Sequence, residues 1–476
     1  MTEASQNAIS LDPSADEMRR WGNAAVEAMS QYLSSIAQQR VYPNTSAAEI
    51  RQKLETVLPV EGSSFDHLLG IFNNAIAPLS RANAHPRMFG YVQSPGTAIA
   101  ALADLLASTL NANLTAWRSA PAAVELERVT LDWIKQIVGL NADAAGLFVS
   151  GGSMANLAAL AAARVAKMPS DASGQSMRIY ASEETHYSIN KAAALLGLGH
   201  VHAITVDDRS KIRIGHLIEC IEADRAAGLF PFCVVANAGT VATGAFDPLL
   251  EIREVARHFN LWMHVDASYG GFAVLAPTAR QLFDGIAQAD SVSLDPHKWL
   301  YLPVDCGCVF YRDAAPARAA FAHQAEYTKV FASNDEAFAF WDYGPELSRR
   351  FRALKVWMLL KGVGTRTLSN AIEKDLACAR HLENLVCRSD DFEMLAPVEL
   401  SIFCFRYRPT LELLETELDK LNERLLVALQ RDGSSYLSNA KVNGRFALRG
   451  CVMNYRTTPG DMEILLDDLR RVASDL

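Results

Sequence analysis

The sequence predicts an α/β fold with a mostly parallel, seven-stranded sheet, preceded by a helical segment and followed by a small α+β domain. The first observation is that short apolar runs rich in β-branched and aromatic residues alternate with helical stretches from about Ala120 onward, which is the pattern of βα units. The second is the composition. The chain has 476 residues, of which 50% are hydrophobic and 21% charged, enough for a large core divided among about two or three domains.

The first 80 residues are predicted to form a helical segment without strands. The helices are expected over 16–39, 46–58 and 64–76. The second should begin at a capping box formed by Ser46 and Glu49, and the third should follow Ser63. Three helices alone can hardly close a core. We therefore expect this segment, residues 1–80, to pack against a second subunit.

The central domain is expected to span residues 81–364 and to carry the sheet. Its seven predicted strands are GLFVS, MRIYAS, VHAITVD, CVVANAG, LWMHVDAS, DSVSLD and CGCVFYR. Ligands of such sheets bind at the carboxyl ends of the strands. Beyond Gly364 we expect a long helix, strand-like segments and a final helix from Asp461. These form the small C-terminal α+β domain, residues 365–476.

Composition also excludes several classes of function. With 45 basic and 54 acidic residues the net charge is −9, which argues against binding to nucleic acid or anionic membranes. No window of about 18 uncharged apolar residues predicts a membrane span. The opening residues lack a basic start and an apolar stretch, so the cytoplasm is the expected location. The eight cysteines are too sparse for a disulfide scaffold. Cys306 and Cys308 are interpreted as buried strand residues, and no metal is expected.

A glycine turn follows the first predicted strand, in the segment VSGGSMAN. Gly152, Ser153 and Met154 begin an alanine- and leucine-rich helix there. Because a helix N-terminus offers free N–H groups and a positive dipole end, this junction can hold a phosphate. The alternative is a plain strand-to-helix connection. The chain contains neither GxGxxG nor GxxxxGK[ST], so the usual dinucleotide and triphosphate interpretations do not apply.

Three further strand ends carry chemically active side chains. Asp266 ends a strand of apolar neighbours, and a buried carboxylate needs a cationic or hydrogen-bonding partner. Lys298 lies just past another strand, between His297 and Trp299; burial favours a neutral amine, which can attack an aldehyde. His186 ends a third strand. The alternatives are a structural ion pair, a solvated lysine and a hydrogen-bonded structural histidine. Together, however, an anion cradle, a carboxylate, a lysine and an imidazole are what a pyridoxal phosphate site needs.

At this point the chain resembles the group II pyridoxal-phosphate-dependent decarboxylases, typified by aromatic-L-amino-acid decarboxylase. The motifs that carry the resemblance occur in family order over nearly the whole chain: HPRMFGYV, APAAVELERVTLDWI, VSGGSMAN, ASEETHYS, AGTVATGAFDPL, LWMHVDASYGG, DPHKWLYLPVDCGC and RRFRALKVW. The resemblance implies the PLP-dependent transferase-like fold type I and a homodimer with the N-terminal helices packed across its interface. It also implies an amino acid as the small-molecule substrate.

The resemblance assigns roles to the strand-end residues. Lys298 would hold pyridoxal 5'-phosphate as an internal aldimine, Asp266 would pair with the pyridine nitrogen, and His186 would stack on the ring. Gly152, Ser153, Met154, Asp295 and His297 would lie near the phosphate. Since Asp295 is itself acidic, we expect it to act through its neighbours and not by direct contact.

Other residues are assigned on the same resemblance. Tyr327, which lies 327 − 298 = 29 residues after the lysine, would protonate the substrate carbon of the quinonoid from a mobile loop; the alternative is an ordinary loop tyrosine. Thr240 would border the cofactor, although several family members have threonine one position later, where this chain has Val241. Tyr91 and Ser94 would face the substrate.

The predicted activity is the decarboxylation of an L-amino acid, aromatic favoured, to an amine and carbon dioxide. Three alternatives remain open. One is an aldehyde synthase, which Tyr327 disfavours because related enzymes with phenylalanine there oxidise their substrates. Another is a decarboxylase of a polar or acidic amino acid, and the last is a catalytically silent relative that binds the cofactor.

Overall fold

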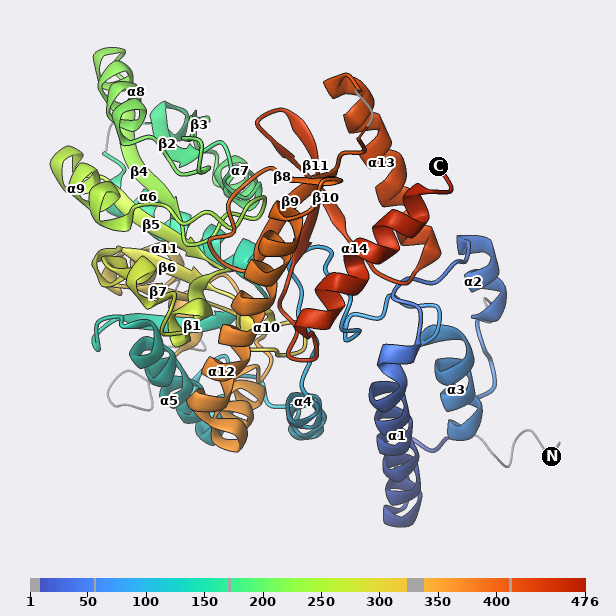
Figure 1. Cartoon of the computed structure of the whole chain (residues 1–476). Helices are drawn as coiled ribbons and strands as arrows, with labels where there is room; N and C mark the ends of the chain where they lie inside the picture. Colours follow the sequence, from blue (N-terminus) through green and yellow to red (C-terminus); the bar gives the residue numbers. More distant parts are fainter. Residues whose placement is uncertain (1–8, 55–56, 170–172, 323–337, 411–412) are drawn as a thin grey trace.

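The computed structural model describes residues 9–54, 57–169, 173–322, 338–410 and 413–476. Its largest unit is a seven-stranded sheet covered by helices (Figure 1). The strands are β1 (Ala145–Val149), β2 (Met177–Ser182), β3 (Val201–Ile204), β4 (Phe230–Asn237), β5 (Trp262–Ala267), β6 (Ser291–Leu294) and β7 (Gly307–Tyr311). Each predicted strand segment overlaps one of them.

The strand order is β1-β7-β6-β5-β4-β2-β3. Strands β3, β2, β4, β5 and β6 are parallel to one another, whereas β7 runs antiparallel to both of its neighbours. The predicted mostly parallel α/β sheet is therefore confirmed. Because β1 is parallel to β6 across β7, the carboxyl ends of β1, β2, β4, β5 and β6 lie at one edge of the sheet. Every residue of β5 and β6 is buried, as expected for strands in the middle of a covered sheet.

Helices connect the strands and cover the sheet. They are α4 (Ala98–Leu110), α5 (Pro121–Val138), α6 (Gly152–Lys167), α7 (Ser188–Leu195), α8 (Ile214–Ala226), α9 (Leu249–Phe259), α10 (Pro296–Trp299) and α11 (Ala315–Phe321). Helix α6 packs against β5, β6 and β7, and also against α7 and α11. Its alanines, from Ala155 to Ala163, are buried, so this small-residue face lets the helix lie close to the strands that carry the site.

The C-terminal part forms a second, antiparallel sheet of order β10-β11-β9-β8. Its elements are α12 (Ala353–Cys387), β8 (Phe392–Met394), β9 (Ile402–Tyr407), α13 (Glu415–Asp432), β10 (Ser438–Val442), β11 (Arg445–Cys451) and α14 (Pro459–Ala473). Helix α12 starts earlier than the predicted Gly364, where a left-handed φ of 73° interrupts it. The sequence analysis missed α4, α13 and β10. In β10, which reads SNAKV, the interior residues are not buried, so the segment lacks an apolar pattern.

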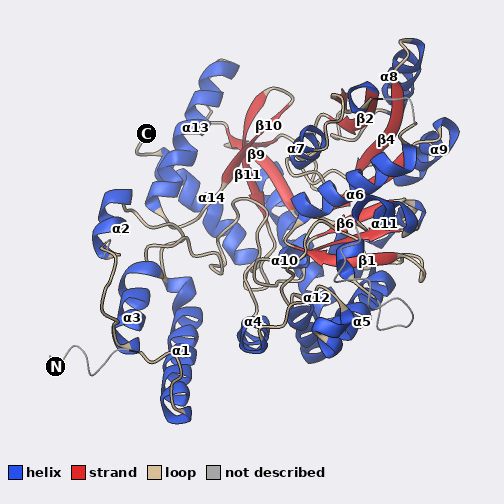
Figure 2. Ribbon diagram, turned by 180° about the vertical axis from the view of Figure 1, so that it is seen from behind, coloured by secondary structure: helices blue, strands red, loops and turns tan. Residues whose placement is uncertain are grey.

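Three N-terminal helices extend away from the seven-stranded sheet, as Figures 1 and 2 both show. They are α1 (Ala15–Ser35), α2 (Ala47–Lys53) and α3 (Phe65–Ile71). The capping box at Ser46 and Glu49 is present. Two predicted boundaries were wrong: α2 ends at Lys53 and does not reach Leu58, and α3 is capped by Ser64, whose hydroxyl accepts the backbone N–H of His67.

Almost none of this N-terminal segment is buried. Ala28 is the single buried residue of α1, and α2 and α3 have none. Within the described ranges, no helix has the length and apolar character needed to cross a bilayer.

Candidate active site

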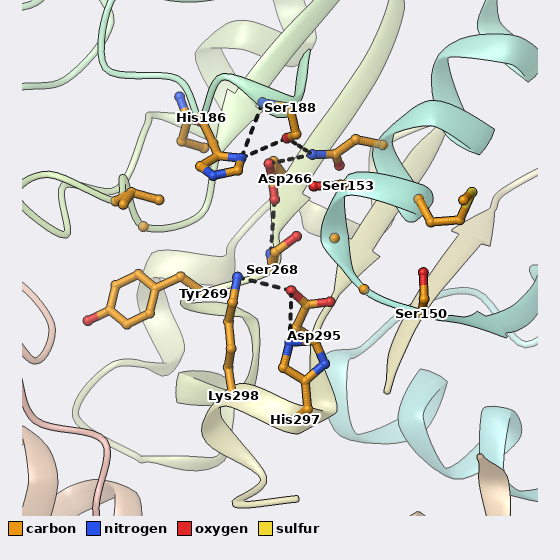
Figure 3. Close-up of a pocket in the computed structure, with 17 residues that line it drawn as sticks. Ser150, Ser153, His186, Ser188, Asp266, Ser268, Tyr269, Asp295, His297 and Lys298 are labelled. Atoms are coloured by element: carbon orange, nitrogen blue, oxygen red, sulfur yellow. Dashed lines mark hydrogen bonds and ion pairs between the residues drawn. The ribbon is translucent and has the colours of Figure 1, made fainter. Parts of the chain in front are cut away.

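A cavity of about 340 Å³ lies at the carboxyl ends of the strands (Figure 3). Its wall is formed by Ser150, Gly151, Gly152, Ser153, Met154, Asn156, His186, Ser188, Asn237, Gly239, Val241, Asp266, Ser268, Tyr269, Asp295, His297 and Lys298. Eight of the predicted site residues are among them: Gly152, Ser153, Met154, His186, Asp266, Asp295, His297 and Lys298. They follow β1, β2, β5 and β6, so strand ends far apart in sequence meet in one place.

The start of α6 forms the glycine-lined part of the wall. A Cβ on Gly152 would lie 2.4 Å from Ser268 Oγ, and one on Gly307 would lie 2.5 Å from the Cα of Gly151. Any side chain at either position would therefore collide with its neighbours. Without side chains, the first turn of this 16-residue helix can bring its positive end close to an anion, and the Ser150 and Ser153 side chains line the same part of the cavity.

Asp266 is held by three hydrogen-bond donors. Its Oδ2 accepts from Asn156 Nδ2 at 2.8 Å, and its Oδ1 accepts from the Ser268 backbone N–H and the Ser293 hydroxyl, both at 3.1 Å. Burial alone would raise the pKa of this carboxyl. The hydrogen bonds from Ser268 and Asn156 and the nearby Lys298 outweigh burial, so the pKa lies below its ordinary value. Asp266 is therefore a permanent anion in the wall.

His186 is fixed by Ser188. The His186 Nδ1 lies 2.8 Å from Ser188 Oγ and accepts the Ser188 backbone N–H at 3.3 Å. Burial lowers the pKa of His186, so the ring is neutral near pH 7. Since Nδ1 is an acceptor, the proton of the neutral ring is on Nε2.

Lys298 and Asp295 form an ion pair at the end of β6. The Lys298 Nζ lies 2.9 Å from Asp295 Oδ2, and His297 Nε2 lies 3.7 Å from the same oxygen. The other oxygen, Oδ1, is buried and has no hydrogen-bond partner among the described residues. His297 Nδ1 accepts the backbone N–H of Cys306 at 3.1 Å, and burial lowers the pKa of this histidine.

The segment that carries Lys298 is anchored from behind by Asp375 of α12. Its Oδ2 accepts from Trp299 Nε1 at 3.0 Å and from Tyr301 Oη at 2.7 Å. The Trp299 ring stacks on Tyr269 with centroids 5.3 Å apart. The lysine is thus attached to a turn that is bonded to α12, and it enters the cavity from this turn (Figure 3).

Three predicted residues lie outside the cavity wall. The Thr240 hydroxyl accepts the backbone N–H of Ala245 and bonds to Thr243, so Thr240 holds the turn and Val241 faces the cavity instead. The Ser94 hydroxyl donates to the carbonyl of His297 at 3.1 Å and reaches the site only through that backbone. Tyr91 lies beside Tyr436, with ring centroids 6.1 Å apart. Tyr327 lies outside the described residues.

The sequence analysis missed several residues that hold the predicted ones. Asn156 and Ser188 are buried and support Asp266 and His186, and both lie in motifs already singled out, VSGGSMAN and ASEETHYS. Arg449 of β11 had no such signal. It is buried, donates from Nε to the carbonyl of Val241 at 2.8 Å, and leaves Nη2 without a partner among the described residues. It is a buried cation directly behind the cavity wall.

The residues present fit pyridoxal phosphate. A lysine amine suits its aldehyde, a permanent carboxylate suits a protonated pyridine nitrogen, and a helix N-terminus suits its phosphate. Among the described residues, no group of three or more His, Cys, Asp or Glu side chains is placed to bind a metal ion.

Comparisons with known proteins agree with this fit. Residues 48–408 match the pyridoxal-dependent decarboxylase conserved domain. The chain is 35% identical over 470 residues to an aromatic-L-amino-acid decarboxylase of Bacillus atrophaeus, covering 98% of this chain and 97% of that protein.

Solved structures give the same result. A tryptophan decarboxylase (TDC) from Oryza sativa, crystallised with pyridoxal phosphate (PLP) and tryptamine, superposes with a TM-score of 0.93 at 30% identity, covering 98% of this chain and 99% of that one. The 4-hydroxyphenylacetaldehyde synthase of Rhodiola rosea has a TM-score of 0.90 at 28% identity, with 97% and 99% covered. The fold is therefore fold type I, and the chain belongs to the family of pyridoxal-phosphate-dependent decarboxylases, which are carboxy-lyases.

Proposed function

We propose that this enzyme removes the carboxyl group of an aromatic L-amino acid, releasing the amine and carbon dioxide. The observation that carries the proposal is the meeting of Lys298, Asp266 and the start of α6 in one cavity. The aromatic preference is supported by the relatives, which include enzymes named for aromatic amino acids in a bacterium and in a plant.

The cavity residues would hold the cofactor as follows. Lys298 would be the residue to which the cofactor aldehyde attaches, Asp266 would pair with the pyridine nitrogen, and His186 would lie against the ring. Gly152, Ser153 and Met154 hold the phosphate with His297, while Asp295 acts on Lys298 and not on the phosphate. When bound, pyridoxal phosphate supplies an electron sink for the pair left on the α-carbon when carbon dioxide departs.

The protein groups supply electrostatics and orientation. Asp266, held anionic by three donors, keeps a proton on the pyridine nitrogen. Arg449 is a buried cation that donates to the carbonyl of Val241 in the wall, and we assign it to the recognition of the substrate carboxylate. Tyr327, 29 residues after Lys298 in the sequence (327 − 298), is proposed as the acid that returns a proton to the α-carbon.

We also propose a homodimer. Helices α1 to α3 bury almost nothing in one chain, and they carry exposed apolar side chains such as Met18, Val26 and Leu68. A second copy would cover these side chains. Within one copy, residues 1–80, 81–364 and 365–476 are proposed as the interface segment, the cofactor domain and the small domain. All eight cysteines are free, which supports a reducing, cytoplasmic location.

The function is tested with purified protein, pyridoxal phosphate and separate aromatic and acidic L-amino acids. Carbon dioxide and amine are quantified together, and Lys298→Ala is the control, expected to be inactive. Equal amounts of both products from an aromatic substrate support the proposal. Turnover of acidic substrates alone would overturn the aromatic preference, and no turnover of any substrate would overturn the enzyme assignment.

An aldehyde synthase is the second candidate because one structural relative carries that name. Tyr327 favours decarboxylation. Tyr327→Phe is expected to suppress amine release. Aldehyde and ammonia should appear in its place, with dissolved dioxygen as the oxidant that is reduced to hydrogen peroxide, and all three products can be measured in the same assay. An unchanged rate of amine release from the variant would show that Tyr327 has no part in the proton transfer.

A further inference from the structure

A chain of buried hydrogen bonds runs from Trp262 on β5 to two residues of the cavity wall. Trp262 Nε1 donates to Ser291 Oγ at 2.8 Å, and Ser291 Oγ lies 2.9 Å from His264 Nδ1. His264 Nε2 lies 3.0 Å from Asn156 Oδ1. The Asn156 Nδ2 then donates to Asp266 at 2.8 Å and to Ser188 Oγ at 2.9 Å. The chain therefore links β5, β6, α6 and α7.

The proton positions in this chain follow from its Asp266 end. Asp266 is anionic and can only accept, so the amide of Asn156 must turn its NH₂ group toward Asp266 and its oxygen toward His264. That oxygen can only accept as well, so His264 must carry its proton on Nε2. At the other end Trp262 can only donate. Its bond to Ser291 leaves the serine hydroxyl free to donate to the unprotonated Nδ1 of His264. The Trp262 end is thus compatible with the arrangement that the Asp266 end requires.

A second branch of the hydrogen-bond chain leads from Asn156 through Ser188 to His186, and its donors and acceptors are fixed in the same way. Ser188 Oγ accepts from Asn156, so its own proton points to His186 Nδ1, 2.8 Å away. One amide, that of Asn156, thus supplies a donor to Asp266 and also sets the direction of the hydroxyl that fixes the His186 ring.

His264 itself does not line the cavity and is fully buried. The charge that acts on the His264 ring is that of Asp266. Its hydrogen-bonding neighbours are the side chains of Ser291 and Asn156 and the backbone of Ser291, all of them neutral. Burial lowers the pKa of His264 to about 4. The ring is therefore neutral near pH 7, as the proton order requires.

We propose that His264 is a positioning residue: by holding the amide of Asn156 in one orientation, it keeps Asp266 supplied with a donor and His186 in the Nε2–H form. This inference rests on the proposed roles of Asp266 and His186 and adds a residue that touches neither cofactor nor substrate. Without His264, the Asn156 amide loses the bond that prevents its rotation, so both cavity residues are affected by one remote change.

The first test is the protonation state of the histidines in the protein without cofactor. Nitrogen-15 NMR of histidine-labelled protein at about pH 7 distinguishes a neutral ring with its proton on Nδ1 from one with its proton on Nε2. The variants His264→Gln and His186→Gln assign the signals. We expect both rings to be neutral with the proton on Nε2. A proton on Nδ1 of His264, or a charged ring, would overturn the proposal. This result does not depend on any activity, so it separates a failure of the proposal from a failure of the proposed function.

The second test compares matched variants. His264→Phe keeps a planar ring but has no donor, whereas the side-chain amide of His264→Gln can still donate to Asn156. His202→Phe is the control: it is the same substitution in β3, at a histidine that bonds to Asp224 and not to a cavity residue. The readouts are the His186 nitrogen shifts, the dissociation constant of pyridoxal phosphate, and the absorbance of the bound cofactor against pH.

We expect His264→Phe to weaken cofactor binding about tenfold, the usual effect of losing one hydrogen bond to a charged group, and to change the His186 shifts and the pH dependence of the absorbance. His264→Gln should restore all three toward wild type, and His202→Phe should leave them unchanged. If His264→Phe does not fold, Asn156→Ala replaces it, with the same expected result. A folded variant with wild-type shifts, affinity and absorbance would refute the role.

Discussion

Two buried carboxylates end neighbouring strands of the same sheet, yet their surroundings differ. Asp266, at the end of β5, accepts three hydrogen bonds from neutral donors. Asp295, just past β6, has one oxygen on Lys298 and another without a partner in the described part of the chain. The relative exposures are similar, 7% and 2%, so burial does not distinguish them.

The difference lies in the donors. A carboxylate held by a backbone N–H, a hydroxyl and an amide keeps its charge whether or not a ligand is bound, because none of these donors leaves. A carboxylate paired with a reactive lysine loses its partner when the lysine is used. Asp266 is thus suited to a constant electrostatic role, and Asp295 to holding the amine in the cofactor-free protein.

The largest expected effect tests the constant role. Asp266→Asn keeps the shape of the side chain but removes its charge, so kcat should fall by about 10²–10³-fold, as for the loss of one preorganised electrostatic group. Carbon dioxide release from the loaded enzyme measures it. Asp266→Glu is the control that retains the charge. If Asp266→Asn kept more than about a third of the wild-type rate, Asp266 would not have the constant electrostatic role that distinguishes it from Asp295.

Asp295→Asn should have a smaller effect than Asp266→Asn. It should strengthen the binding of an anion. The substitution removes a negative charge near Gly152 and frees the Lys298 ammonium, so inorganic phosphate should bind the cofactor-free protein about tenfold more tightly. Calorimetric titration with phosphate measures this, with Asp266→Asn for comparison. Weaker binding by the Asp295 variant would mean that Asp295 helps to hold the anion.

The free energy of unfolding should also depend on pH, because a buried histidine lies near each of the two carboxylates. Burial lowers the pKa of His264, behind Asp266, to about 4, whereas the ordinary value is 6.5. As the pH falls, His264 therefore binds its second ring proton in the unfolded chain before it does so in the folded chain. Its contribution to the free energy of unfolding is complete above about pH 6.5 and is lost as the pH falls toward 4. The total for His264 is roughly 3 kcal/mol.

Urea unfolding at about pH 7 and about pH 5 checks this. The wild type should lose more free energy of unfolding than His264→Gln over this interval. His297, behind Asp295, is not completely buried, and its variant His297→Gln should differ less from the wild type. If the wild type, His264→Gln and His297→Gln all lost the same free energy of unfolding, the pH dependence would not come from His264.

The smallest effect is expected at Ser94, which supports the Asp295 side only through the backbone of His297. Ser94→Ala removes one hydrogen bond, so the free energy of unfolding should fall by about 1 kcal/mol while KM for the amino acid stays the same. A large increase in KM with unchanged stability would instead restore the direct substrate contact that the sequence resemblance implied.

Much of the fold was predictable because its signals are local. The seven strands are short apolar runs between helices, and a strand buried on both faces needs such a run whatever its neighbours are. Strand β10 was missed because its interior residues are not buried and so give no apolar pattern. Helix α13 was missed although Leu418, Leu425 and Leu429 recur at helical spacing, a local signal that the prediction did not use. The boundary of α2 was wrong because the helix makes no buried contact in this chain that would extend its last turn.

The candidate site divides in the same way. Asp266 lies at the end of β5, and Gly152, His186 and Lys298 come within four residues after a strand ends. One motif therefore contains both the strand and the side chain at its end. Thr240 was misplaced by one position because the turn after β4 directs Thr240 inward to Thr243 and Val241 toward the cavity. A sequence pattern does not resolve which of two adjacent turn residues faces a ligand.

By itself, then, the sequence determined the α/β class, the strand ends that carry chemistry and the family to which the motifs belong, since each depends on residues that are neighbours along the chain. Only the tertiary structure decided which donors reach Asp266, that Asp295 pairs with Lys298, and that Trp262, Ser291, His264 and Asn156 form one ordered chain. These contacts join residues up to 110 positions apart. They arise because parallel strands bring distant segments to one edge of the sheet, and no local pattern specifies which side chains meet there.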